Sequence, residues 1–98
     1  MTLVAVWRPS ADQDLGVVLA EIPEEYKERF WDVLEQTVQT IQDFPEAFPV
    51  VYAEKAVRRV VLKPFPYLLF YVVELNRVAI LALIHGRQNP DKIAKRFE

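Results

Sequence analysis

The side chains best suited to chemistry in this chain are basic residues grouped in its second half. Arg58 and Arg59 are neighbours in a segment rich in branched residues, and Lys63 follows them. Arg87 comes soon after His85, at the end of a later segment of the same kind. A planar guanidinium can grip a phosphate or a carboxylate at two points. We therefore predict a target- or phosphate-binding surface here. The alternative is ordinary surface arginines that pair with acidic residues.

His85 is the single histidine, and it closes an apolar segment. Near neutral pH it could act as a general acid or base, or it could contact a phosphate. The alternative is a structural histidine that hydrogen-bonds across the end of a sheet. The sequence alone leaves both interpretations open.

Other chemistries lack the residues that they need. The chain has no cysteine, two glycines and one serine, Ser10. These counts argue against disulfides, thiolate catalysis, Cys-based zinc sites, phosphate-cradling glycine loops and acyl transfer. We expect neither a metal nor a cofactor.

Acidic residues crowd the first half at helical spacing, and several are four apart: Glu21, Glu24, Glu25, Glu28, Asp32 and Glu35. Such a series could imitate a metal site or an acid/base pair. No histidine lies near them in sequence, and we interpret the series as a solvated helix face.

Charge and composition limit the class of protein. Residues 1–50 carry ten acidic and three basic side chains, whereas residues 51–98 carry four acidic and nine basic ones. One face should therefore attract anions and another repel them. With 52% hydrophobic residues, the 98-residue chain is expected to form a single globular domain. Its apolar runs are too short for the roughly 20 residues that span a bilayer, and the N-terminus lacks signal-peptide features, so we expect a cytoplasmic protein.

The elements that must position the basic residues begin with a short strand over Leu3 to Trp7. Ser10 is predicted to cap a helix over Ala11 to Ile22, because a serine oxygen can accept from the helix's free N–H groups. Pro23 should open a second helix, whose apolar stripe recurs at three- and four-residue steps from Tyr26 to Phe44. Both helices should cover one face of a sheet.

The second half reads as strands. We predict strands over Val57 to Lys63, Tyr67 to Glu74 and Arg77 to His85, with a further short strand at Val50 to Tyr52. Asn76 is expected to take a positive φ in the tight hairpin between the last two strands. Asn89 and Pro90 should start a short helix over Asp91 to Phe97. The result is an α+β fold with two helices on a mainly antiparallel sheet of four or five strands.

Three motifs in series give the chain a family resemblance. Arg58-Arg59 in one strand leads into Phe65-Pro66-Tyr67, and the last strand ends in the motif Ala82-Leu83-Ile84-His85-Gly86-Arg87-Gln88-Asn89-Pro90. This series resembles the RelE/ParE superfamily of type II toxin–antitoxin toxins, and it is closer to ParE. The resemblance implies a small toxin that a cognate antitoxin wraps.

The resemblance implies two alternative targets. ParE-like members poison DNA gyrase, whereas RelE-like members cut messenger RNA on the ribosome without a metal. Arg59 (or Arg58) and Arg87 stand where RelE-like members place arginines for the scissile phosphate. Gln88 stands where many ParE-like members have an arginine, and Ile93 where RelE-like members often have a tyrosine. A third alternative is an inactive module that keeps the fold and binds a partner. An exposed sheet edge or helix face could also make the free protein a homodimer.

Overall fold

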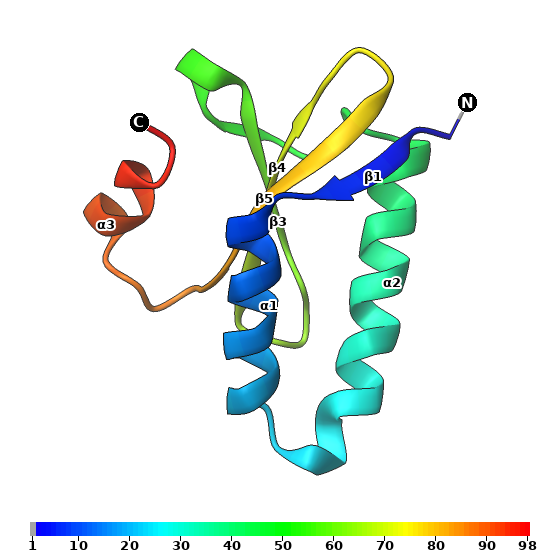
Figure 1. Ribbon diagram of the computed structural model, residues 1–98, viewed down its shortest axis with the longest axis vertical. Helices are drawn as coiled ribbons and strands as arrows, with labels where there is room; N and C mark the ends of the chain where they lie inside the picture. Colours follow the sequence, from blue (N-terminus) through cyan, green and yellow to red (C-terminus); the bar gives the residue numbers. More distant parts are fainter. Residues whose placement is uncertain (1) are drawn as a thin grey trace.

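The computed structural model describes residues 2–98. In chain order, the two long helices come before four of the five strands (Figure 1). The first-half elements are β1 (Val4–Trp7), α1 (Pro9–Glu21), the 3-10 turn η1 (Glu24–Tyr26) and α2 (Lys27–Asp43). The second-half elements are β2 (Val50–Tyr52), the 3-10 turn η2 (Ala53–Lys55), β3 (Val57–Val61), β4 (Tyr67–Val73), β5 (Arg77–His85) and α3 (Pro90–Lys95). This order confirms the predicted α+β fold.

The five strands form one sheet in the order β1-β5-β4-β3-β2. β1 runs parallel to β5, and every other neighbouring pair is antiparallel. Since β4 and β5 are connected directly and pair from Tyr67↔His85 to Val73↔Val78, they form the expected hairpin. The register shifts beside Phe70 and Tyr71, where Leu81 of β5 has no partner on β4. Such a bulge bends the strand locally.

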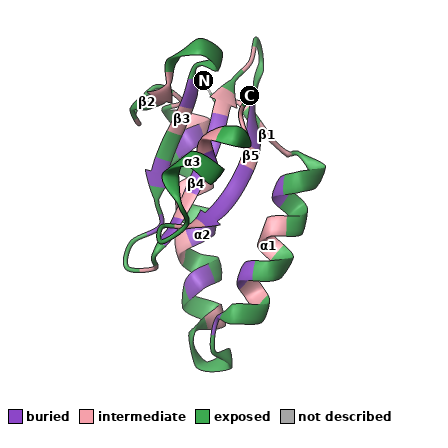
Figure 2. Ribbon diagram, turned by 90° about the vertical axis from the view of Figure 1, so that its left-hand side faces the viewer, coloured by how far each residue is buried: buried purple, intermediate pink, exposed green. Residues whose placement is uncertain are grey.

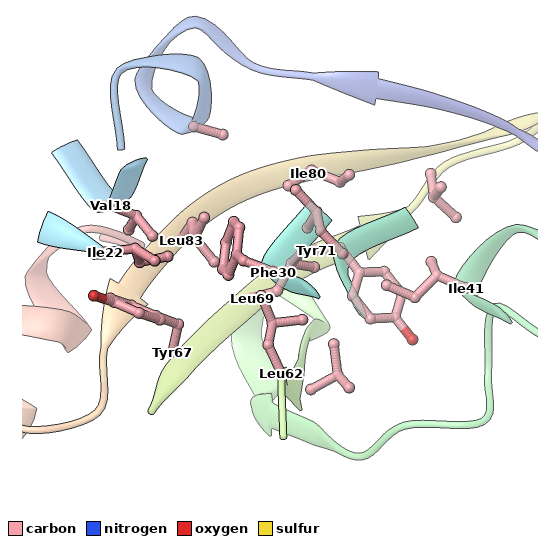
Figure 3. Packing of buried hydrophobic residues seen from close by; sticks show 14 residues of the cluster. Val18, Ile22, Phe30, Ile41, Leu62, Tyr67, Leu69, Tyr71, Ile80 and Leu83 are labelled. Atoms are coloured by element: carbon pink, nitrogen blue, oxygen red, sulfur yellow. The ribbon is translucent and has the colours of Figure 1, made fainter. Parts of the chain in front are cut away.

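The main core lies between the sheet and the two long helices (Figure 3). α2 is amphipathic because Phe30, Leu34 and Ile41 recur on one face, and all three are buried. Phe30 lies edge-on to Tyr67, with ring centroids 6.1 Å apart. The aromatic residues Tyr67, Phe70 and Tyr71 are buried, and Phe65 packs against the core, so this group stabilises the fold.

A smaller core covers the opposite face of the sheet, where α3 packs. Ile93 of α3 is buried against this face, and Phe97, just beyond the helix, lies 5.0 Å from the ring of Phe70. Figure 2 shows α3 in front of the largely buried central strands. The Asn89 side chain caps α3 by accepting from the N–H of Asp91, as the sequence predicts. α3 ends at Lys95, two residues earlier than expected.

Four local predictions are wrong. α1 begins at Pro9, so Ser10 lies inside the helix and does not cap it. Pro23 precedes a 3-10 turn, and α2 starts only at Lys27. β3 ends at Val61, and Lys63 lies in the turn that follows. Among residues 2–98 the only non-glycine residue with a positive φ is Ala56, so Asn76 turns the hairpin with a negative one.

Candidate functional site

The neighbouring arginines Arg58 and Arg59 point to opposite faces of the sheet, as expected for successive residues of a strand. Arg58 lies on the helix-covered side, where its Nη1 donates to the carbonyl oxygens of Glu46 (3.2 Å) and Phe48 (2.6 Å). This arginine therefore holds the loop before β2 against the sheet. Its guanidinium is already occupied by these two carbonyl groups and is not free for a target.

Arg59 lies on the other face of β3, opposite Phe70 of β4, and it is exposed. No ion pair or side-chain hydrogen bond involves it within the described part of the chain. A guanidinium held on a strand above apolar neighbours can reach an acidic partner without first giving up an internal contact.

Lys63 and Arg87 lie at the same end of the sheet, because β3 and β5 end where β4 begins. Both are exposed, and neither forms an ion pair among residues 2–98. The N–H of Gly86 donates to the carbonyl of Pro66 at 2.8 Å, which ties the exit of β5 to the turn before β4. We call Arg59, Lys63 and Arg87 the basic rim.

The basic rim is not a compact cluster. Arg59 is level with Phe70 and Ala82, whereas the end of β5 is level with Tyr67. Three residues along a strand span about 10 Å, so Arg59 is set back from the end of the sheet by that length. The three cations can contact separate points of a large partner. They do not converge on a single small group.

His85 is half-buried, and contacts on both sides fix its ring. Its Nδ1 accepts a hydrogen bond from the backbone N–H of Arg87 at 3.0 Å. The ring stands edge-on to Tyr67, with centroids 5.3 Å apart and an interplanar angle of 80°. Because Nδ1 is an acceptor, the neutral ring carries its proton on Nε2. His85 thus shapes the turn that presents Arg87.

Tyr67 lies beside His85, and its hydroxyl donates to Oε2 of Glu21 at 3.3 Å. Burial, together with the charge of Glu21, raises the pKa of the Tyr67 hydroxyl above its ordinary value. Tyr67 therefore keeps its proton more firmly than a free tyrosine. It is a poor source of that proton for a reaction.

The two residues that depart from the family pattern have ordinary surroundings. Gln88 is exposed, and its backbone N–H donates to the carbonyl of His85 at 3.1 Å. Ile93 of α3 is buried against the sheet, with 6% of its surface exposed. In the described residues no group of His, Asp or Glu side chains could hold a metal ion. No helix there is long and apolar enough to cross a membrane.

Sequence reasoning missed a polar connection between α1 and β5. Ser10 donates to the carbonyl of Leu81 at 3.2 Å, and Asp14 accepts from the N–H of Leu83 at 3.0 Å. Asp14 also accepts from Arg96 at 2.9 Å. β1 pairs with β5 only as far as Ile80, so these side chains continue the edge where the strand stops. The four-residue spacing of Ser10 and Asp14 indicates only that both lie on one face of a helix.

The architecture defines a class of two-layer α+β proteins, in which two long helices cover one face of a five-stranded sheet. Lys63 and Arg87 lie at the strand ends, and Arg59 lies on the face that these helices leave uncovered. The fold matches a chain of a solved structure described as the chromosomal ParDE TA system from P. aeruginosa, with a TM-score of 0.70 and 18% identity. The match covers 86% of this chain and 96% of that one. A search of curated proteins gives no significant match.

The family follows from the sequence itself. Residues 5–90 match the family model of the ParE toxin of type II toxin–antitoxin systems, parDE. The chain therefore belongs to the ParE toxin family, which confirms the expected superfamily and its closer branch. The matched range contains the whole basic rim and stops at the first residue of α3.

Proposed function

We propose that this ParE-family chain arrests growth by binding a protein target, DNA gyrase, and that a cognate antitoxin holds it inactive in the cytoplasm. The family match over residues 5–90 carries the proposal. Arg59, Lys63 and Arg87 would supply contacts to the target. Their exposure and their lack of ion pairs along residues 2–98 support this role, since unpaired cations steer and anchor acidic partners.

A metal-independent ribonuclease of the RelE kind is the alternative. Such an enzyme needs a proton donor beside the leaving oxygen and converging positive charge on the phosphate. The ring of His85 is fixed by Arg87 and Tyr67, and the pKa of Tyr67 is raised. Ile93 offers no proton at the position where a tyrosine would stand. These surroundings favour target binding over RNA cleavage.

The first test is induced expression in a bacterial host without an antitoxin. We expect growth to stop with signs of DNA breakage, and the purified protein to inhibit supercoiling by gyrase. Codon-specific cuts in ribosome-bound messenger RNA would replace this proposal with the ribonuclease. Normal growth despite accumulation of folded protein would contradict both toxin activities and would favour the third alternative, an inactive interaction module.

The second test concerns the basic rim. Arg59→Ala and Arg87→Ala should each weaken inhibition about tenfold, because a well-placed interface arginine contributes on that order. Arg29→Ala on α2 removes the same charge from the helical side and serves as the control. Wild-type toxicity in both variants would show that Arg59 and Arg87 do not contribute to binding of the target. Arg58→Ala is unsuitable, because Arg58 holds the Glu46 and Phe48 carbonyls.

A further inference from the structure

Two hollows adjoin at the side chains of Glu21 and Tyr67, near the turn that joins α1 to α2. One has a volume of about 330 Å³ and the other about 220 Å³. Because Glu21 and Tyr67 line both hollows, these form two halves of one site, which we call the Tyr67 cleft. In Figure 3 the Tyr67 ring lies beside Ile22, and its hydroxyl oxygen points away from Phe30.

The first hollow is largely apolar, and its walls are rigid. Pro23 and Tyr26 come from the turn between the two long helices, and Pro64, Phe65 and Pro66 come from the turn between β3 and β4. Prolines and aromatic rings lose little conformational freedom when a ligand orders them, because few of their bonds rotate. The Tyr26 ring leaves 52% of its surface exposed, so a flat apolar group in the hollow would remove part of that surface from water. This half therefore suits an aromatic ring.

The second hollow is polar, and two of its charges are paired with each other. Asp14 and Arg96 form an ion pair in which Oδ2 and Nη2 are 2.9 Å apart, so their charges largely cancel. His85 and Gln88 add uncharged polar groups to the wall. Since Nδ1 of His85 already accepts a hydrogen bond, Nε2–H is the group that its ring has left for a ligand. This half therefore suits the polar part of a ligand.

Glu21 decides the charge of that polar part. The Tyr67 hydroxyl donates to its Oε2 at 3.3 Å, which holds the carboxylate where the two hollows meet, and no cation pairs with it among residues 2–98. Arg29 of α2 also lines the apolar hollow, but no ion pair or side-chain hydrogen bond fixes it within the same residues. A group that is already held in place binds at a lower cost in entropy than a mobile one. The cleft therefore favours a cation on Glu21 over an anion on Arg29.

We propose that the Tyr67 cleft binds a small aromatic amine, with its ring in the apolar hollow and its ammonium group on the Glu21 carboxylate. The apolar hollow, at about 330 Å³, reaches the lower end of the range of about 300–1,000 Å³ that small-molecule sites occupy. The ammonium group would donate a charge-assisted hydrogen bond, which is stronger than a neutral one. The inference goes beyond the proposed toxin activity, since Arg59, Lys63 and Arg87 line neither hollow, and it stands whether or not the chain inhibits gyrase.

Three indole compounds test the class of ligand, because they share one ring system and differ in charge. Tryptamine is a cation, indole-3-ethanol is neutral and indole-3-acetate is an anion. In an NMR titration of the whole chain, tryptamine should shift the signals of residues that line the two hollows, with saturation in about the millimolar range expected for so small a ligand. Indole-3-ethanol should bind about fivefold more weakly, and indole-3-acetate more weakly still. Equal binding of the three compounds, no saturation with tryptamine, or shifts confined to other parts of the molecule would overturn the proposal.

Three variants tie the binding to the cleft. Glu21→Gln keeps the shape of the side chain and an oxygen for the Tyr67 hydroxyl, so it should weaken tryptamine about fivefold and leave indole-3-ethanol unchanged. Glu25→Gln removes the same charge from the neighbouring 3-10 turn, outside the cleft, and should change neither. Tyr26→Ala should weaken both compounds to a similar degree, because it removes part of the apolar wall.

The NMR spectrum of each variant without ligand verifies that it folds. Equal weakening of tryptamine in Glu21→Gln and Glu25→Gln would overturn the proposal, since the effect would then follow from net charge alone. Unchanged tryptamine binding in both Glu21→Gln and Tyr26→Ala would also overturn it, because the ligand would then lie elsewhere.

Discussion

Asp14 connects three parts of the molecule through one carboxylate. It lies on α1, accepts from the backbone of β5 at Leu83, and accepts from Arg96 beyond the end of α3. Its side chain is 19% exposed. A hydrogen bond to a charged acceptor that is shielded from water is among the stronger polar contacts in a protein. Removing it also leaves the N–H of Leu83 without its partner.

We expect Asp14→Ala to lower the free energy of unfolding by about 2–3 kcal/mol, since a charged hydrogen bond is lost and a backbone donor is stranded. Asp12→Ala, two residues earlier on the exposed side of α1, should cost much less. Arg96→Ala should cost under about 1 kcal/mol, because it removes only the more exposed ion pair. Urea denaturation measures all three, and equal losses for Asp12 and Asp14 would contradict this account.

The residues of the candidate site were predictable only where a local rule applied. The period of a strand predicted that Arg58 and Arg59 face opposite sides, and they do. Nothing local indicated that Arg58 would hold carbonyls or that Ser10 would bind Leu81, which lies 71 positions away. These contacts depend on how the helices meet the sheet, which a pattern of residues along one segment does not contain.

At the scale of elements, Tyr71 of β4 anchors the loop between α2 and β2. Its hydroxyl donates to the carbonyl of Pro45 at 2.8 Å, and Arg58 holds two further carbonyls of the same loop. Tyr71 is fully buried, and burial raises the pKa of its hydroxyl above the ordinary value of 10.0. The folded state therefore favours the protonated form of the Tyr71 hydroxyl.

Tyr71→Phe should lower the free energy of unfolding by about 1 kcal/mol at neutral pH, because one buried hydrogen bond is lost. The unfolded chain releases the phenol proton near pH 10, before the folded chain does, so wild-type stability should fall as the pH rises beyond that value. The variant should lose less over the same range, with a remaining slope from Tyr67. Denaturation from pH 7 to 11 checks this, and parallel slopes would contradict it.

Long periodic segments were the most predictable elements. The stripe of α2 and the runs that became β4 and β5 were recognised because burial imposes a regular repeat on many residues. Helix starts and turns depend on a few backbone angles. Pro9 begins α1 one residue before the expected cap, and Asn76 completes its hairpin without a positive φ.

At the scale of the whole molecule, charge is divided between the two sides. The acidic residues of α1 and α2 cover one face of the sheet. Arg59 and the lysines of α3 lie on the other face, and Lys63 and Arg87 lie at the end of the sheet. Unlike faces of two copies attract each other, but such a contact is head-to-tail and does not close into a symmetric dimer. This differs from the homodimer that the sequence suggested as one state of the free protein.

We therefore expect weak, concentration-dependent association of the free protein at low ionic strength. It should disappear in about 0.5 M salt, where the Debye length falls to a few ångströms. Sedimentation velocity at both salt concentrations measures the effect. A discrete dimer that persists in high salt would instead indicate an apolar interface and would support the prediction of a homodimer.

The hydrogen bonds between α1 and β5 also limit where insertions and deletions can be tolerated in the chain. One residue inserted or deleted between Arg8 and Asp14 turns the rest of the helix by about 100° relative to the strand. The Asp14 carboxylate would then leave the Leu83 N–H, and no neighbouring strand would replace it. Length differences among related toxins should therefore accumulate at the turn before α2 and around residues 53–56, and the spacing from β1 to Asp14 should stay constant.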